Sequence, residues 1–421
     1  MAAKQLCRNY TLYILVHLMN PYLFISKRII TGNKKNYSAN VLKIAVGTVA
    51  VGVVVMLLSL FIIRGFKHQI EYKVSGFVGN VQISGYTDAW TTENIFLSPD
   101  TLNAIRNVPG VSFLQSFANI TGVIKTNDII EGVMFKGVGS DFCRSCFSGK
   151  IIEGNFPSFN SSLNDSVVVS KIIADKLNIH LYDKIEAYFL QNQQPLARKF
   201  VVSAIYESGF SDYDKMFVLV DINHVRKLNK WQDNTVGGYE VFVSSLPKIE
   251  NVSKTITTML PYYCNVQTMY DVNPQVFDWL DLQDVNVAVL LTVMIVVCII
   301  TMISVMLIII IEKTSMIGIL KAVGMRNTGL QKIFLYKSAY LTIIGVIIGD
   351  AIALTLSFIQ IKWGIISLPQ ETYYVSTVPV QINFLDFCLV NLLTLLTCIT
   401  MMMLPVKFIS NVNPVKSINF E

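Results

Sequence analysis

Four long apolar windows constrain this chain more than any other feature of its sequence. Residues 44–63, 285–311 and 387–406 contain no charged side chain, and residues 338–361 contain only Asp350. Each window has about the 20 residues that a helix needs to cross a hydrocarbon core roughly 30 Å thick. Backbone groups find no water partner in lipid, so such runs must be helical. Because four such windows exceed what the core of a soluble protein holds, we predict an α-helical membrane protein with four transmembrane helices.

The distribution of charge predicts the orientation of these helices. Residues 1–43 contain seven Lys or Arg and no acidic residue, and the 312–337 loop and the 407–421 tail are also basic. An excess of Lys and Arg marks cytoplasmic segments. We therefore place these three segments in the cytoplasm, and the net-acidic segments 64–284 and 362–386 outside. The formal charge of +6 then reflects membrane topology, and no nucleic-acid binding is predicted.

The N-terminus leaves one question open. Residues 1–18 contain a short apolar patch but no A-x-A-like cleavage site, so we do not interpret them as a signal peptide. Met19 is an alternative start, which would make the first 18 residues an extension.

Segment 64–284 is long enough for a sizeable domain between the first and second helices. "NVQISGY" alternates apolar and polar residues as a half-buried strand does. "DSVVVSKIIADKLNIHLYDKIEAYF" predicts a strand, a short helix capped by Ser170 and a second strand, and two later stretches, "KMFVLVDINHVRKLN" and "YEVFVSSLPKIENVSKTITTML", repeat the strand-then-helix order. With turns at Pro109-Gly110 and Gly154-Asn155 and a polar loop at 160–165, the pattern indicates an α+β domain.

This domain contains no recognisable catalytic motif, and no catalytic residue is predicted. The four histidines are scattered, and neither G-x-S-x-G nor H-E-x-x-H occurs. Cys143 and Cys146 form a C-x-x-C pair, which can be a disulfide in an oxidising compartment, an unbonded pair, a redox couple or half of a zinc site. A zinc site needs two more ligands, and Cys264 is the only other cysteine of the segment. No metal site is therefore predicted.

The chain also lacks a nucleotide-binding loop of the G-x-x-x-x-G-K-[ST] type. The nearest approach, Gly132 to Gly137, is followed by Val138. Energy for transport would have to come from another chain.

A short basic helix is predicted in the 312–337 loop. Thr314 or Ser315 can cap it, Gly324 suits a left-handed stop, and Met316, Ile319, Leu320 and Val323 share one helical face. Such a helix can dock into a groove on a soluble partner or lie on lipid headgroups. Its residues are Thr314, Ser315, Met316, Ile317, Gly318, Ile319, Leu320, Lys321, Ala322, Val323 and Gly324.

The stretch "IIEKTSMIGILKAVGMRNTGLQKIFLYKSAYLTIIGVIIG" resembles the signature of the FtsX/MacB-like permease family, although that family often has Glu where this chain has Met316. Within the family, "FISKRIITGNKK", "GFKHQIEYKVSGFVGNVQISGY", "LPQETYYVSTVPVQIN" and "LPVKFISNVNPVKSINFE" are most similar to the lipoprotein-releasing permeases of the LolC/LolE type. The likeness extends from about Met19 to the end and is weaker within residues 85–270.

The resemblance implies a type VII ABC permease of the bacterial inner membrane, with a MacB-like periplasmic core domain. Such a permease is a non-catalytic mechanotransmission subunit. Its partners would be a LolD-like ABC ATPase that binds ATP and Mg²⁺, a second permease subunit in a homo- or heterodimer, a LolA-like periplasmic carrier and the lipoprotein itself. No cofactor is expected on this chain. The alternatives are a MacB-like exporter permease, an FtsX-like regulator of cell-wall hydrolases, or a membrane-anchored scaffold without transport activity.

Three further sets of residues are candidates within the membrane. Under the resemblance, an apolar cavity for acyl chains could be lined by residues of the first and second helices, although each of these could equally face lipid or pack in a core: Val51, Val54, Met56, Leu58, Val289, Val293 and Val297. Gly47 and Gly52 would permit close helix approach. Asp350, near the centre of the third helix, is expected to make a hydrogen bond between helices.

Overall fold

The computed structural model describes residues 37–86, 94–126, 129–159, 163–191 and 194–407, and the predicted alternative start at Met19 lies outside these ranges. The chain divides into two compact units. We call the first the membrane unit; it comprises the chain up to Gly65, Leu282–Ile366 and the chain from Pro379. The second, the extracytoplasmic unit, comprises Phe66–Asp281 and Ser367–Val378.

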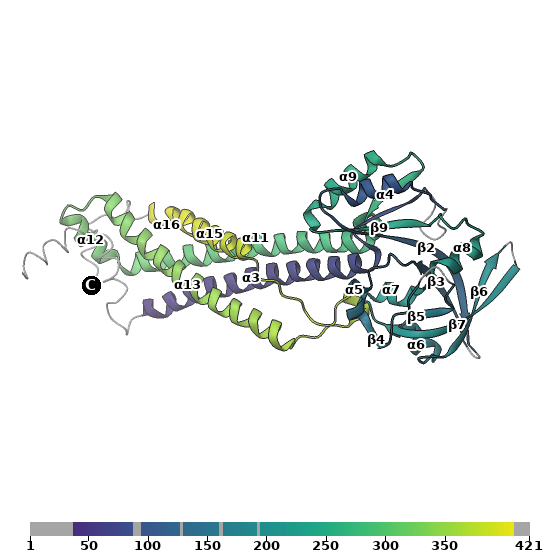
Figure 1. Cartoon of the computed structure of the whole chain (residues 1–421). Helices are drawn as coiled ribbons and strands as arrows, with labels where there is room; N and C mark the ends of the chain where they lie inside the picture. The colour runs from purple at the N-terminus through teal and green to yellow at the C-terminus, as the bar shows by residue number, and fades with distance from the viewer. Residues whose placement is uncertain (1–36, 87–93, 127–128, 160–162, 192–193, 408–421) are drawn as a thin grey trace, which may run out of the picture. The chain divides into compact units, whose positions relative to one another are not determined.

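Four helices of the described residues are long and apolar enough to cross a membrane, which confirms the predicted number (Figure 1). They are α3 (Tyr37–Val78), α11 (Pro274–Glu312), α13 (Asn327–Trp363) and α15 (Phe384–Met401), the last followed by the short α16 (Met403–Lys407). Helix α12 (Thr314–Ala322) lies between α11 and α13 in the chain. The first three helices are longer than the predicted spans, because a helix that crosses a membrane can continue on either side of it.

Glycines allow the helices of the membrane unit to approach one another closely. A Cβ atom at Gly349 of α13 would lie 2.8 Å from the carbonyl oxygen of Ala50 on α3. One at Gly52 would lie 2.5 Å from the sulfur of Cys298 on α11. The expected role of Gly52 in helix contact is therefore confirmed. That of Gly47 is wrong, since a Cβ atom there would meet nothing within 4 Å.

The extracytoplasmic unit contains a mixed sheet of ten strands among its described residues. Nine strands follow the order β10-β1-β9-β2-β3-β8-β5-β7-β4, and β6 pairs with β2 and β7. Two neighbouring pairs, β3 with β8 and β5 with β7, are parallel, and the others are antiparallel. The strands are β1 (Val81–Gly85), β2 (Val111–Lys125), β3 (Ile130–Val138), β4 (Ile151–Gly154), β5 (Ser166–Ser170), β6 (Lys184–Gln191), β7 (Gln194–Tyr206), β8 (Phe217–Asp221), β9 (Gly238–Val243) and β10 (Cys264–Thr268).

Short helices complete this unit, and the predicted strand-then-helix segments are confirmed. Ser170 ends β5 and accepts a hydrogen bond from the backbone N–H of Ile173, so it caps α6 as expected. Gly110 and Gly154 have φ values of +107° and +77°, as the predicted turns require. The helices are α4 (Pro99–Arg106), α5 (Arg144–Phe147), α6 (Lys171–Leu177), α7 (Ser211–Met216), α8 (Ile222–Asn229), α9 (Ile249–Met259), α10 (Met269–Val272) and α14 (Gln370–Tyr373).

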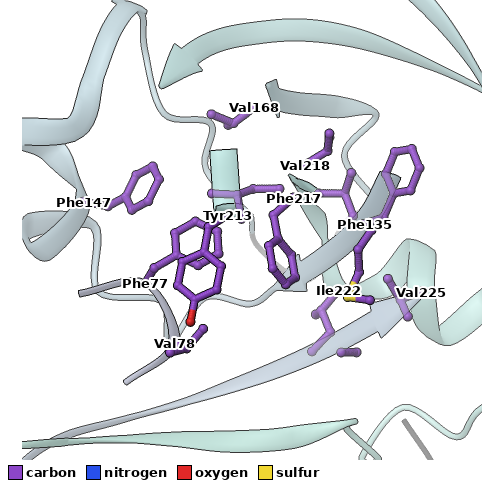
Figure 2. Packing of buried hydrophobic residues seen from close by; sticks show 14 of the residues in the cluster. Phe77, Val78, Phe135, Phe147, Val168, Tyr213, Phe217, Val218, Ile222 and Val225 are labelled. Carbon is purple, nitrogen blue, oxygen red and sulfur yellow. The ribbon is translucent and has the colours of Figure 1, made fainter. Parts of the chain in front are cut away.

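The core of the extracytoplasmic unit is rich in aromatic side chains. Figure 2 shows Phe77, from the end of α3, beside Tyr213 and Phe217. The rings of Phe77 and Tyr213 stack with centroids 5.0 Å apart, and Phe217 lies 5.3 Å from Phe77. Because α3 ends among these rings, its last residues are part of the domain core.

Candidate functional site

Only Lys313 separates α12 from α11, and the closeness of the two helices determines how the N-terminus of α12 is capped. The predicted cap by Thr314 or Ser315 is wrong: Lys313 is the N-cap residue, and no side chain caps the helix. The Thr314 hydroxyl instead donates to the carbonyl oxygens of Ile310 and Ile311, at 3.1 and 2.7 Å. These carbonyls belong to the last turn of α11, where helix carbonyls commonly lack an intrahelical partner. The Thr314 hydroxyl is therefore engaged with the end of α11.

The end of α12 is as predicted. Gly324 has a φ of +93°, the left-handed conformation that favours glycine. The next residue, Met325, donates its backbone N–H to the carbonyl of Leu320 at 3.0 Å, and Gly324 donates to Lys321 at 3.0 Å. This pair of bonds stops the helix and turns the chain towards α13.

The apolar face of α12 is divided between core and surface. Ile317 is fully buried in the hydrophobic cluster of the membrane unit, and Met316 and Leu320 pack against that cluster. Ile319 and Val323 remain 53% and 82% exposed. The helix is therefore anchored on one side, while a pair of apolar residues one turn apart is presented on the other.

Asp350 makes the expected hydrogen bond between helices. The side-chain amide of Asn391, on α15, donates to its carboxyl group at 3.1 Å. The other carboxyl oxygen of Asp350 and the amide oxygen of Asn391 are buried without a hydrogen-bond partner among the described residues. Asn391 was missed from the sequence because an uncharged amide does not interrupt an apolar window, although an intramembrane Asp calls for a polar partner.

The proposed lining residues of a substrate cavity do not all lie on one surface. Val289, Val293 and Val297 are exposed on α11, at a spacing of four residues, and Val51 is exposed on α3. Val54 and Leu58 are partly exposed. Met56 is only 1% exposed and packs in the hydrophobic cluster of the membrane unit, so it does not line an open surface of this chain.

Cys143 is part of a disulfide bond. Its backbone N–H donates to the side-chain oxygen of Gln115 at 3.0 Å, which fixes the segment against β2. The side chain of Cys146 lies outside the described side chains, so its pairing with Cys143 stays a prediction. Among the described residues, no group of three or more His, Cys, Asp or Glu is arranged to hold a metal ion.

Two ion pairs were also missed from the sequence. Lys136 on β3 and Glu240 on β9 form a pair of 2.6 Å in the core of the extracytoplasmic unit, where both side chains are almost fully buried. Arg64, near the unit boundary on α3, contacts Asp386 of α15 with two nitrogen–oxygen distances of 3.1 and 3.4 Å. Residues so far apart in sequence give no local signal that they meet.

Sequence comparison places this architecture in a known family. The model of the MacB-like periplasmic core domain matches residues 44–276, more than half of the chain, and that of the FtsX-like permease C-terminal region matches residues 288–414. The chain belongs to the FtsX/MacB-like permease family. It is therefore a permease subunit of the ABC-transporter type, and its four apolar helices and periplasmic-type domain fit a multi-pass protein of the inner membrane.

Relatives within the family match over most of their length. The chain is 19% identical over 392 residues to the lipoprotein-releasing system transmembrane protein LolC of Xylella fastidiosa, covering 89% of this chain and 92% of that protein. It is 21% identical to the corresponding LolE protein of Haemophilus influenzae, covering 88% and 92%. The periplasmic region of MacB from Actinobacillus actinomycetemcomitans aligns with 48% of this chain and 95% of that structure, at 11% identity and a TM-score of 0.32.

Proposed function

We propose that this chain is the permease subunit of an ABC transporter that extracts lipoproteins from the inner membrane and passes them to a soluble periplasmic carrier. A separate ATPase subunit would bind ATP and Mg²⁺ and supply the energy, and a second permease subunit would complete the transporter. The observation that carries the proposal is α12, which is anchored by Ile317 and presents Ile319 and Val323. This helix lies in the basic loop that we predict to be cytoplasmic. The names of the relatives support the substrate class.

The energetics of this task explain why an ATPase is needed. Each CH₂ group of an acyl chain loses about 0.8 kcal/mol when it leaves the membrane interior. A triacylated lipoprotein carries many such groups, so its release does not occur spontaneously. An apolar surface on the permease would offset part of this cost. The exposed valines of α11 and Val51 of α3 are suited to provide it once a second permease subunit covers them.

The first test addresses the contact with the ATPase. Ile319→Asp and Val323→Asp place a charge on the exposed side of α12, and each should abolish co-purification of the ATPase from membranes while insertion stays normal. The matched control is Thr328→Asp, because Thr328 is also exposed and follows α12 in the chain. This variant should retain the ATPase. Leu320→Asp is less informative because Leu320 packs against the hydrophobic cluster of the membrane unit. Retention of the ATPase by both α12 variants would contradict the docking role.

The second test addresses the substrate. Depletion of the chain should cause lipoproteins to accumulate in the inner membrane, measured by membrane fractionation and immunoblotting. Vesicles that contain the permease pair and the ATPase should release acylated protein to a soluble carrier only when ATP is present. If the ATPase associates through α12 but lipoproteins still reach their destination, the chain is an FtsX/MacB-type permease for another task.

A further inference from the structure

A cavity of about 410 Å³ opens in the extracytoplasmic unit, in a region that the transport proposal does not use. Its walls come from strands β1, β2, β3, β8, β9 and β10, from helices α7 and α10, and from the last residue of α3 and the first residues of α11. Such concave sites with a mainly apolar wall and a few polar groups are where proteins bind small molecules.

The apolar wall combines rigid rings with adaptable side chains. Phe117, Tyr213 and Phe217 supply aromatic surface, and the Tyr213 and Phe217 rings lie 5.7 Å apart in an edge-to-face arrangement. Figure 2 shows both of them packed beside Phe77, which holds them in place. Met134 and Met216 complete the wall. Aromatic faces attract cations, and thioethers fit ligands of irregular shape.

Among the described residues, one basic side chain, that of Lys136, lines the cavity, and it already has hydrogen-bond partners. Lys136 donates to the Phe77 carbonyl and to Glu240, both at 2.6 Å. The second oxygen of Glu240 accepts a hydrogen bond from Gln115 at 2.7 Å. The pair is thus neutral as a whole and hydrogen-bonded on both sides, so it offers little to an anionic ligand.

In the part of the chain that the structure describes, the other charged residues that line the cavity are Asp212 and Asp271, both acidic. Asp271 also accepts hydrogen bonds from the backbone N–H and the hydroxyl of Thr268, at 2.8 and 2.7 Å. The charges of the lining therefore sum to a negative value and favour a positive ligand.

We propose that this cavity binds a small organic cation with an aromatic or apolar body. The body would lie against Phe117, Tyr213 and Phe217, and the cationic group towards Asp212. Val78, the last residue of α3, and Val276, near the start of α11, also line the cavity. A bound cation would thus touch the ends of two of the long helices as well as the sheet.

The test uses a set of small probes of similar size and different charge. Trimethyl(naphthylmethyl)ammonium is the cation, neopentylnaphthalene is its uncharged isostere, and naphthalenesulfonate is the anion. Equilibrium dialysis measures their binding to the full chain in lipid nanodiscs, with empty nanodiscs subtracted. Saturable binding of the cation at least about 10-fold tighter than of either other probe is expected. Equal binding of all three, or no binding beyond the empty nanodiscs, overturns the proposal.

Two variants locate the site. Met134→Trp fills the cavity and should weaken cation binding at least about 10-fold, whereas Met259→Trp, on exposed α9 surface away from the cavity, should not. Asp212→Asn keeps the size of an exposed side chain, and it should weaken binding of the cation about 3- to 10-fold while leaving binding of the isostere unchanged. Unchanged cation binding in both cavity variants overturns the assignment. None of these measurements depends on the ATPase or on lipoprotein, so they are independent of the proposed function.

Discussion

The side-chain amide of Asn391 on α15 donates a 3.1 Å hydrogen bond to the carboxyl group of Asp350 on α13. These are polar groups within two helices that are long and apolar enough to span a membrane. The other oxygen of the Asp350 carboxyl group and the amide oxygen of Asn391 are buried without a hydrogen-bond partner among the described residues. A protonated carboxyl group would have an O–H to donate where an ionised one has none. The pair therefore suits a neutral contact between helices.

Asp350→Asn should keep the membrane unit intact, because an amide supplies both a donor and an acceptor at the same position. Asn391→Leu should destabilise it by about 0.6–2 kcal/mol, since it leaves the carboxyl group without its donor. A double-mutant cycle with Asp350→Leu, measured by unfolding in nanodiscs, gives the coupling energy. Loss of turnover in Asp350→Asn with normal assembly would instead indicate that the ionised carboxylate is needed.

The sequence predicted those features of the fold that depend on local pattern. Window length gave the number of membrane helices, and the Ser170 cap and the glycine turns follow from the preferences of single residues. The glycine at the end of α12 was found in the same way. Each of these features can be predicted from residues that are close together in the sequence.

Features that depend on residues far apart in the chain were not predictable. Lys136 and Glu240 belong to different strands, and neither position looks unusual in the sequence. The start of α12 was misjudged because the Thr314 hydroxyl is used by the end of α11. Likewise, helical spacing put Met316, Ile319, Leu320 and Val323 on one face, but only packing decides which of them are exposed.

Gly349 should tolerate no side chain at the contact between α13 and α3. Its Cβ position lies 2.8 Å from the Ala50 carbonyl oxygen, and a backbone atom of a helix cannot move aside alone. Gly349→Ala should therefore destabilise the membrane unit by about 1–3 kcal/mol, measured by thermal unfolding in nanodiscs. Gly47→Ala is the matched control: its Cβ would meet nothing within 4 Å, and the gain in helix propensity should leave stability equal or higher. Equal effects of the two variants would contradict the close packing.

Replacing one member of the buried Lys136–Glu240 pair should lower the stability of the extracytoplasmic unit far more than replacing both. Lys136→Met leaves a buried carboxylate without its cation, which typically costs about 3–5 kcal/mol of unfolding free energy. The double variant Lys136→Met, Glu240→Leu removes both charges and should recover much of that loss. The measurement is unfolding of the extracytoplasmic unit over a denaturant series, with proteolysis as the readout. Additive effects of the two changes would show that the charges do not interact.

Lys150 is a partly buried, titratable side chain of the extracytoplasmic unit that contacts the end of α3. Its ammonium group donates to the Gly76 carbonyl at 2.8 Å, one residue before the carbonyl that Lys136 binds. Burial, together with the nearby charge of Lys136, lowers the pKa of Lys150 to about 8. In the unfolded chain the same pKa returns to its ordinary value of about 10.4. The folded protein therefore releases this proton at a lower pH than the unfolded protein does.

Between pH 8 and the unfolded value, only the unfolded chain carries the proton on Lys150, so the unfolding free energy should rise with pH across this window. The rise amounts to at most about 3 kcal/mol. It is measured by proteolysis of the full chain in nanodiscs over a denaturant series at several pH values. Lys150→Met should lose this part of the slope, whereas Lys254→Met, at an exposed position, should keep it. If the unfolding free energy has the same pH slope in the wild-type chain and in Lys150→Met, Lys150 stays protonated throughout the window. Burial at the end of α3 would then not lower the pKa of Lys150.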